Sequence, residues 1–383
     1  MKTSRRAWRL AAALAAPALM AATLAGTGLG PAQAATAGCK SKAAEPLNPG
    51  TFRQLVSIAV LSPCNVWAVG SFNSSNKLEK TLIEHWDGSK WKVIPSPNPS
   101  GAKNSDLNSV SAASPTSIWA VGEYDSATSF QTRPLILHWD GQHWTRQNNP
   151  APGIFDFLDA VTATSGGEAW AVGHFLKNKF ETPLALHFAG GHWSQATLPD
   201  FGTVHLRAVT ATSAKDVWAA GGIDEPDGSV QTLILHWDGE AWTRTPTPSP
   251  GFIPELSSVV ASSPKNALAV GLVQPENDGT TPIRTLALHW NGTVWTRVPS
   301  ANPANVKIEA VLNGVAFISK GSARAVGEAD GRSLIEQWNG KRFALVKGSI
   351  PGADLFGIAG TSAGNQWAIG SKGAKTYVLH FTK

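Results

Sequence analysis

Cysteine is scarce in this 383-residue sequence, which contains only two cysteines, two methionines and two tyrosines. Two cysteines are too few for a disulfide-based scaffold or a cysteine-ligated metal cluster. Beyond the N-terminal region, no segment approaches the roughly 20 apolar residues that a membrane-spanning helix needs. No segment sustains a period of about 3.6 residues, so we expect almost no helix. Only 15% of the residues are charged, while 42% are hydrophobic and 16 are tryptophan. That composition excludes a disordered chain.

The N-terminal region has the three parts of an export signal. It opens with four basic residues: Lys2, Arg5, Arg6 and Arg9. A run rich in alanine and leucine follows from Leu10 to Leu29, and Ala32–Ala34 supplies small residues for cleavage after Ala34. We therefore predict a signal peptide over residues 1–34 and a secreted, extracellular protein. The general secretory route and the twin-arginine route both stay open, since Ser4–Arg6 resembles a twin-arginine start.

The formal charge of +5 belongs mostly to this signal. Four of the 32 basic residues and none of the 27 acidic residues lie within it, which leaves 28 against 27, or a net charge of +1. A nearly neutral protein has no general attraction for polyanions. We therefore expect neither nucleic acid nor an anionic membrane as a partner.

Three short motifs recur through the rest of the chain. The first, Trp-Ala-Val-Gly, occurs at Trp67–Gly70, Trp119–Gly122 and Trp170–Gly173, and variants end at Gly221, Gly271, Gly327 and Gly370. The second, His-Trp-Asp-Gly, begins at His85, His138 and His236, with variants at His187, His289, Gln337 and His380. A third aromatic slot holds Trp91, Trp144, Trp193, Trp242, Trp295 and Phe343. All 15 tryptophans beyond the signal fall in these slots, so the chain consists of seven copies of one unit.

Each copy has the pattern of four short strands. In the second copy these are Leu107–Val110, Ile118–Gly122, Pro134–Trp139 and a strand that starts at Trp144, with Asp140-Gly141 as a tight hairpin. We place the copies at approximately residues 51–100, 101–152, 153–200, 201–250, 251–303, 304–350, and 351–383 together with 39–45.

Spacing is constant where the strands lie. The leucine of the first strand precedes the glycine of the first motif by 15 residues in every copy, as from Leu107 to Gly122. Length varies only between strands two and three and between strand four and the next strand one. These two loops emerge at the same end of an up-and-down sheet, which we call the loop face. Seven such units predict an all-β, seven-bladed β-propeller over residues 35–383, with tryptophans packed between blades.

The seventh copy contains no fourth strand. Counting back 16 residues from Leu55, the distance from Trp91 to Leu107, leads to Cys39, and Cys39–Gly50 resembles the segment that begins at Trp91. We therefore expect residues 39–45 to form the outer strand of the last blade and to close the ring.

The two cysteines would then lie in adjacent blades, on the face opposite the loop face. In an exported protein, this arrangement favours a disulfide between Cys39 and Cys64 over two free thiols. Lipidation of Cys39 is disfavoured, because Thr36 stands where a large aliphatic residue is expected.

The combined motifs, in forms such as VWAVG at Val66–Gly70 and TLILHWDG at Thr232–Gly239, resemble a family of tandem-repeat secreted bacterial propellers. The resemblance covers about residues 39–383. It implies a propeller fold of the kelch and WD40-like kind and no particular chemistry. The paired glycine of kelch repeats occurs only at Gly221-Gly222, and Trp86-Asp87 lacks the Gly-His partner of WD40 repeats.

The sequence carries no recognisable catalytic or cofactor motif, whether HExxH, CxxC, Gly-x-Ser-x-Gly or a phosphate-binding loop. The histidines of the second motif would lie about 10 Å or more apart in different blades, too far to ligate one metal ion together. We expect each of them to hydrogen-bond within its blade. Asp227 and Asp278 precede glycines and indicate turns rather than a calcium site. We therefore predict no metal and no cofactor.

The loop face is the better place for a site. The residues beside the strand-one leucines are polar there and differ from blade to blade, and we propose eight as ligand-binding: Asp106, Asn108, Asp159, His205, Arg207, Glu255, Asn313 and Asp354. The alternative is that these strand ends are polar only because they are solvated.

A uniform scaffold without a catalytic constellation favours a monomeric, non-enzymatic recognition module that binds a glycan, a peptide or a cell-wall component. The rival interpretation is an extracellular hydrolase or lyase that acts on polysaccharide with carboxylates such as Asp106, Asp159, Glu255 and Asp354, because paired catalytic carboxylates lie about 5–10 Å apart. A purely structural surface protein is the third interpretation.

Overall fold

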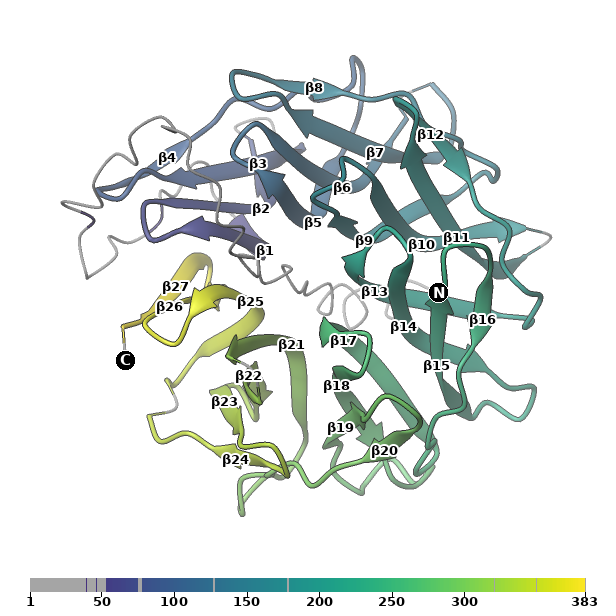
Figure 1. Ribbon diagram of the computed structural model, residues 1–383, viewed down its shortest axis with the longest axis vertical. Helices are drawn as coiled ribbons and strands as arrows, with labels where there is room; N and C mark the ends of the chain where they lie inside the picture. Colours follow the sequence, from purple (N-terminus) through teal and green to yellow (C-terminus); the bar gives the residue numbers. More distant parts are fainter. Residues whose placement is uncertain are drawn as a thin grey trace, which may run out of the picture.

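The computed structural model describes residues 39, 46, 53–74, 78–126, 128–177, 179–319, 321–348 and 350–382. In this part of the chain there are 27 strands and no helix. The strands form seven antiparallel sheets, six with four strands each and the seventh, β25-β26-β27, with three. The predicted all-β, seven-bladed propeller is thereby confirmed (Figure 1).

The strands of each blade follow one another in sequence from the axis outward, and we number the blades 1 to 7 in chain order. The inner strands are β1 (Arg53–Ser62), β5 (Ser105–Ser114), β9 (Asp156–Ala163), β13 (Val204–Ser213), β17 (Ile253–Ser263), β21 (Ala310–Ser319) and β25 (Ala353–Ser362). The second strands are β2 (Asn65–Asn73), β6 (Ser117–Asp125), β10 (Ala169–Lys177), β14 (Asp216–Asp224), β18 (Asn266–Gln274), β22 (Ser322–Ala329) and β26 (Asn365–Lys372). The third strands are β3 (Glu79–Trp86), β7 (Thr132–Trp139), β11 (Phe180–Ala189), β15 (Val230–Trp237), β19 (Arg284–Trp290), β23 (Ser333–Trp338) and β27 (Lys375–Phe381). The outer strands are β4 (Trp91–Val93), β8 (Trp144–Arg146), β12 (His192–Gln195), β16 (Trp242–Arg244), β20 (Trp295–Arg297) and β24 (Phe343–Leu345).

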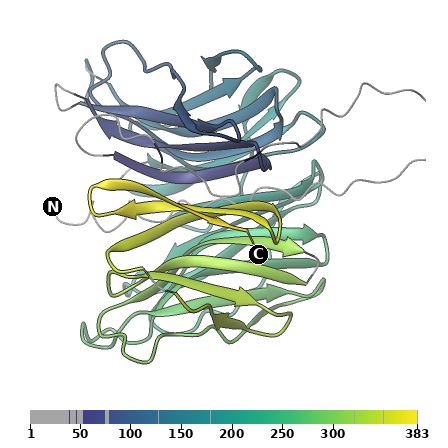
Figure 2. The ribbon, with the colours of Figure 1, turned by 90° about the vertical axis from the view of Figure 1, so that its left-hand side faces the viewer.

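The inner strands close the ring. Each one packs against the inner strands of the two neighbouring blades, and β25 of blade 7 packs against β1 of blade 1. Figure 2 shows the yellow strands of blade 7 beside the purple strand of blade 1. Apart from Cys39, the predicted closing strand at residues 39–45 lies outside the described residues, so its pairing with blade 7 stays a prediction.

The structure joins Cys39 to Cys64, which confirms the predicted disulfide. The two Cα atoms are 5.5 Å apart, and Cys64 lies in the turn between β1 and β2. Disulfides of this kind are typical of oxidising compartments. No described segment forms a helix long and apolar enough to cross a membrane.

Replacing both cysteines by serine is expected to lower the free energy of unfolding by about 3 kcal/mol, because the bond spans 25 residues and removes loop entropy from the unfolded chain. Denaturant unfolding of the oxidised wild type and the double variant measures the effect. A difference below about 0.5 kcal/mol would show that the bond does not constrain the unfolded chain.

The constant 15-residue spacing is a register pair. The inner-strand leucine faces the motif glycine across the sheet, as Leu55 faces Gly70 and Leu206 faces Gly221. A Cβ atom on Gly70 would come closer than 3.0 Å to the backbone carbonyl oxygen of Gln54, and the corresponding glycine of every other blade meets the same obstacle. The residue after the leucine has no register partner in the second strand, so each inner strand carries a bulge there.

Aromatic side chains fill the blade boundaries, as predicted. The first-motif tryptophan of one blade packs between two aromatic rings of the next. Trp170 of blade 3, for example, lies 4.9 Å from Trp237 and 5.1 Å from Trp242 of blade 4, measured between ring centroids. At the boundary of blades 6 and 7, Arg324 replaces tryptophan, and its guanidinium carbon lies 4.1 Å from the centroid of the Phe381 ring. The departure of blade 6 from the repeat therefore keeps an aromatic contact.

Candidate functional site

The histidines of the second motif have structural partners. Five of the six rings pack against the first-motif tryptophan of their own blade, as His236 does on Trp218 with 4.1 Å between ring centroids. The exception is His289, whose blade has Leu268 in that slot and whose ring centroid lies 5.3 Å from that of Trp338 in blade 6. The His236 imidazole places Nε2 2.7 Å from Oδ1 of Asp216 at the start of β14, and His85 pairs with Asn65 at the corresponding place. The predicted hydrogen bond within the blade is thus confirmed for five histidines, since His138, His187 and His289 make corresponding contacts, and it stays a prediction for His380. The repeated histidines therefore lie outside the candidate site.

Four of the predicted residues meet on the loop face where blades 3, 4 and 5 adjoin. Asp159 and Arg207 are the bulge residues of β9 and β13. The buried Arg207 side chain donates from Nε to Oε1 of Glu255 on β17, at 3.0 Å. Arg207 also experiences the negative charge of Asp159. The fourth residue, His205, lies two positions before Arg207 on β13.

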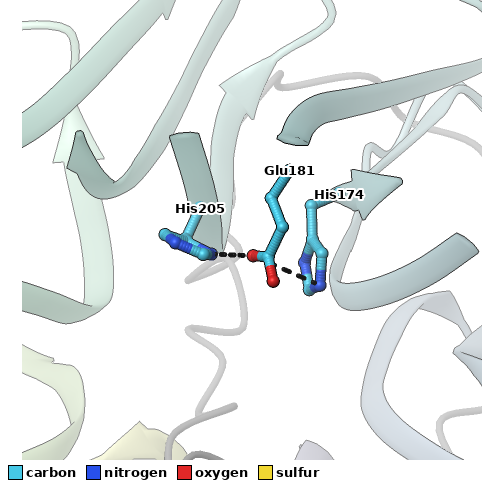
Figure 3. Close-up of side chains that lie close together, drawn as sticks. All are labelled: His174, Glu181 and His205. Carbon is cyan, nitrogen blue, oxygen red and sulfur yellow. Dashed lines mark ion pairs between the residues drawn. The ribbon is translucent and has the colours of Figure 1, made fainter. Parts of the chain in front are cut away.

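His205 belongs to a tight polar cluster that spans two blades (Figure 3). Its Nδ1 atom lies 2.6 Å from Oε2 of Glu181 at the start of β11, and its Nε2 atom lies 3.0 Å from Oδ2 of Asp224 at the end of β14. On the other side of Glu181, His174 of β10 places Nε2 3.9 Å from the same carboxylate oxygen. Nδ1 of His174 lies 3.2 Å from Oδ2 of Asp159. The Glu181 carboxylate thus lies between the two imidazole rings.

The cluster has a strong internal field. Burial would lower the pKa of His205, but hydrogen bonds to Asp224 and Glu181 outweigh it and raise that pKa to about 9. The hydrogen bond to His205 lowers the pKa of Glu181. Burial opposes the charge of Arg207, yet Glu255 raises its pKa. Four carboxylate side chains therefore surround two cations, His205 and Arg207, and negative charge predominates.

The other predicted residues lie elsewhere. The Asn108 side chain donates to the Leu158 carbonyl of the next blade at 2.9 Å, and Asn313 donates to the Leu355 carbonyl in the same way. These two bulge residues tie neighbouring blades together. Asp106 is buried at the start of β5 in blade 2.

Asp354 belongs to a separate carboxylate group between blades 6 and 7. Burial, followed by hydrogen bonds and charge repulsion from Asp354 and Glu309, raises the pKa of Glu328 to about 9. The predicted residues thus do not form one site around the axis. Asp227 and Asp278 accept backbone hydrogen bonds within turns, which confirms the turn interpretation.

Sequence reasoning missed His174 and Glu181. His174 follows the motif glycine Gly173 directly, a slot that holds serine in blade 1 and glycine in blade 4. The same slot holds Glu123 in blade 2 and Glu328 in blade 6, but a histidine occurs there only in blade 3, and this was the available signal. Glu181 sits at the end of a variable loop, and its approach to His205 depends on the packing of blade 3 against blade 4.

An open groove of about 1190 Å³ lies beside the cluster, between the loops of blades 3 and 4. Its lining includes Phe180, Phe201, Asp200, Asp224 and Thr203. Phe180 is 66% exposed, an unusual state for a phenylalanine, and Phe201 is half-buried. Asp224 both lines this groove and contacts His205, so groove and cluster adjoin. We call it the blade 3–4 groove.

The sequence matches no protein-family profile and no curated protein. Its fold is similar to solved structures at low identity. A YCF48 structure bound to a D1 peptide aligns with a TM-score of 0.52 and 15% identity over 89% of this chain and 100% of that one. A polysaccharide lyase of family PL25, an ulvan lyase, aligns with a TM-score of 0.57 and 10% identity over 88% of this chain and 94% of that one. Hydrazine synthase of Kuenenia stuttgartiensis aligns with a TM-score of 0.57 and 12% identity over 92% of this chain and 99% of that one. At these identities the likeness establishes the propeller fold alone.

Proposed function

We propose that the protein is a secreted recognition module that binds an extracellular glycan in the blade 3–4 groove. The lining of the groove carries the proposal. Sugar rings combine apolar C–H faces with a rim of hydroxyl groups, and Phe180 and Phe201 offer apolar ring surface to the former. Asp200, Asp224 and Thr203 offer hydrogen-bond acceptors to the latter. An aromatic surface with a few polar groups is the usual lining of a ligand site.

Secretion is supported by two separate features. The first 34 residues have the composition of an export signal, and the disulfide suits an oxidising environment. A glycan or cell-wall polymer is a ligand that such a protein would meet. A peptide, as in the YCF48 complex, is the competing ligand class.

The test is an array of oligosaccharides and peptides probed with the mature protein. We expect glycan binding that Phe180→Ala weakens at least tenfold, because loss of the ring removes the apolar platform. Phe130→Ala is the matched control, since this phenylalanine is 92% exposed on a loop of blade 2, outside the groove. Equal weakening by both substitutions, or binding to peptides alone, would contradict the proposal. No binding at all would favour a structural surface protein.

One observation favours a second function, an extracellular hydrolase or lyase that acts on polysaccharide. Asp224 connects the groove to His205, so a bound sugar would lie beside titratable groups. The same array, incubated and assayed for new reducing ends or unsaturated sugars, decides between the two. Product formed by the wild type and lost in Asp159→Ala would replace the binding function with the enzymatic one.

A further inference from the structure

The His174, Glu181 and His205 side chains converge so that each can offer one ligand atom to a shared metal ion. One ligand atom from each residue lies within 4.8 Å of the other two, and no other three His, Cys, Asp or Glu residues do so in the part of the chain that the structure describes. Ligands bound to a tetrahedral zinc ion at about 2.0–2.2 Å are themselves about 3.4 Å apart. The observed separations from Oε2 of Glu181, 2.6 Å to His205 and 3.9 Å to His174, come within about 1 Å of that spacing.

The outer nitrogens of both rings provide a second, independent observation. Nδ1 of His174 faces Asp159, and Nε2 of His205 faces Asp224, each at hydrogen-bond distance. A carboxylate that holds one nitrogen of an imidazole directs the other nitrogen toward a metal and strengthens it as a ligand. Here both remaining nitrogens point at Glu181. Such paired orientation is the usual outer shell of histidine ligands.

We propose that His174 Nε2, Glu181 and His205 Nδ1 bind a divalent transition-metal ion of the zinc class, oriented by Asp159 and Asp224. Two imidazoles and one carboxylate suit zinc-class ions, whereas calcium and magnesium take oxygen ligands. Zinc replaces the proton that Nδ1 of His205 shares with Glu181, and this proton passes to solvent. The excess of carboxylates in the cluster compensates the remaining added positive charge. Three protein ligands leave a fourth position for water or a ligand group. This proposal departs from the expectation of no metal, which was drawn from the repeated histidines. His174 and His205 lie outside that motif and come from two adjoining blades.

The site rests on its own residues and does not depend on glycan binding. His236 makes this distinction testable, because it also pairs with a carboxylate, Asp216, at 2.7 Å. Among the described residues, however, it belongs to no group of three that could share a metal ion. His236 is therefore a matched control for a histidine–carboxylate pair that lacks a coordination sphere.

Zinc chloride titrated into tag-free, chelator-dialysed protein tests the proposal by calorimetry, with metal content measured after equilibrium dialysis. We expect one saturable zinc ion per chain and a rise in melting temperature on binding. His174→Ala and His205→Ala should weaken binding at least 100-fold, Asp224→Asn 10- to 100-fold, and His236→Ala should leave it unchanged. Glu181→Gln, which keeps the size of the side chain, replaces either alanine variant that fails to fold.

Two results would overturn the site. One is that the wild-type protein binds no zinc when the zinc concentration is about ten times the protein concentration. That result would show that the cluster is only an ion-pair network around His205. The other is zinc binding of equal strength in the wild type and His205→Ala, with both proteins folded by circular dichroism. If the wild type binds zinc but no glycan, the proposed function is refuted and the metal site is not.

Discussion

Replacing Gly70 by alanine is expected to lower the free energy of unfolding by more than about 4 kcal/mol, enough to prevent folding at 37 °C. The new methyl group would come closer than 3.0 Å to the backbone carbonyl of Gln54. Neither partner can move, because both belong to paired strands in the ring and Leu55, directly opposite, is fully buried. Relief of the clash would require β1 and β2 to separate. Soluble yield and denaturant unfolding measure the outcome.

The control for this prediction is Gly166→Ala. Gly166 lies in an exposed turn of blade 3, and its nearest atom to an added Cβ would be 3.8 Å away. Its stability should stay within about 0.5 kcal/mol of the wild type. If Gly70→Ala unfolds with the same midpoint as Gly166→Ala, close approach of the two strands does not explain the repeated glycine.

Replacing Arg207 by methionine is expected to lower the free energy of unfolding by about 3–5 kcal/mol, because it leaves the Glu255 carboxylate without the buried guanidinium that pairs with it. Asp159 and Glu181 lose a neighbouring positive charge as well. Adding Glu255→Met to this variant should restore at least half of the lost free energy of unfolding, because it removes the unpaired carboxylate. Urea unfolding of the wild type, the two single variants and the double variant completes the cycle.

The cycle separates an ion pair from simple packing. If Arg207→Met costs less than about 1 kcal/mol, or if the double variant is no more stable than the single one, the pair contributes little. The buried arginine would then act mainly through the volume of its side chain.

The fold was predictable because the repeat records the register of the sheets. A leucine that faces a glycine across two hairpin strands must keep a constant separation, and Leu55 and Gly70 do so in the same way as Leu206 and Gly221. The disulfide was predictable because the sequence has an export signal and only two cysteines, which the repeat places on the same face of adjacent blades. The outer strand of blade 7 remains a prediction, because residues 40–45 lie outside the described part of the chain.

The site was predictable only in part, because the repeat identifies slots but not which slots of neighbouring blades touch. Asp159, His205, Arg207 and Glu255 came from the slots beside the leucine, and the structure brings them together. Asn108 comes from the same slots, yet it serves as a tie between blades. His174 and Glu181 lie on the second and third strands, and their convergence on His205 requires the docked blades.

A crystal structure of the complex with the glycan that binds most tightly in the array is the most direct test of the central claim, that the loop-face groove between blades 3 and 4 is the binding site. We predict electron density for the sugar against Phe180 and Phe201, with a hydroxyl group within hydrogen-bond distance of Asp224. Density on the opposite face of the propeller, or over the loops of any other pair of blades, would contradict the claim.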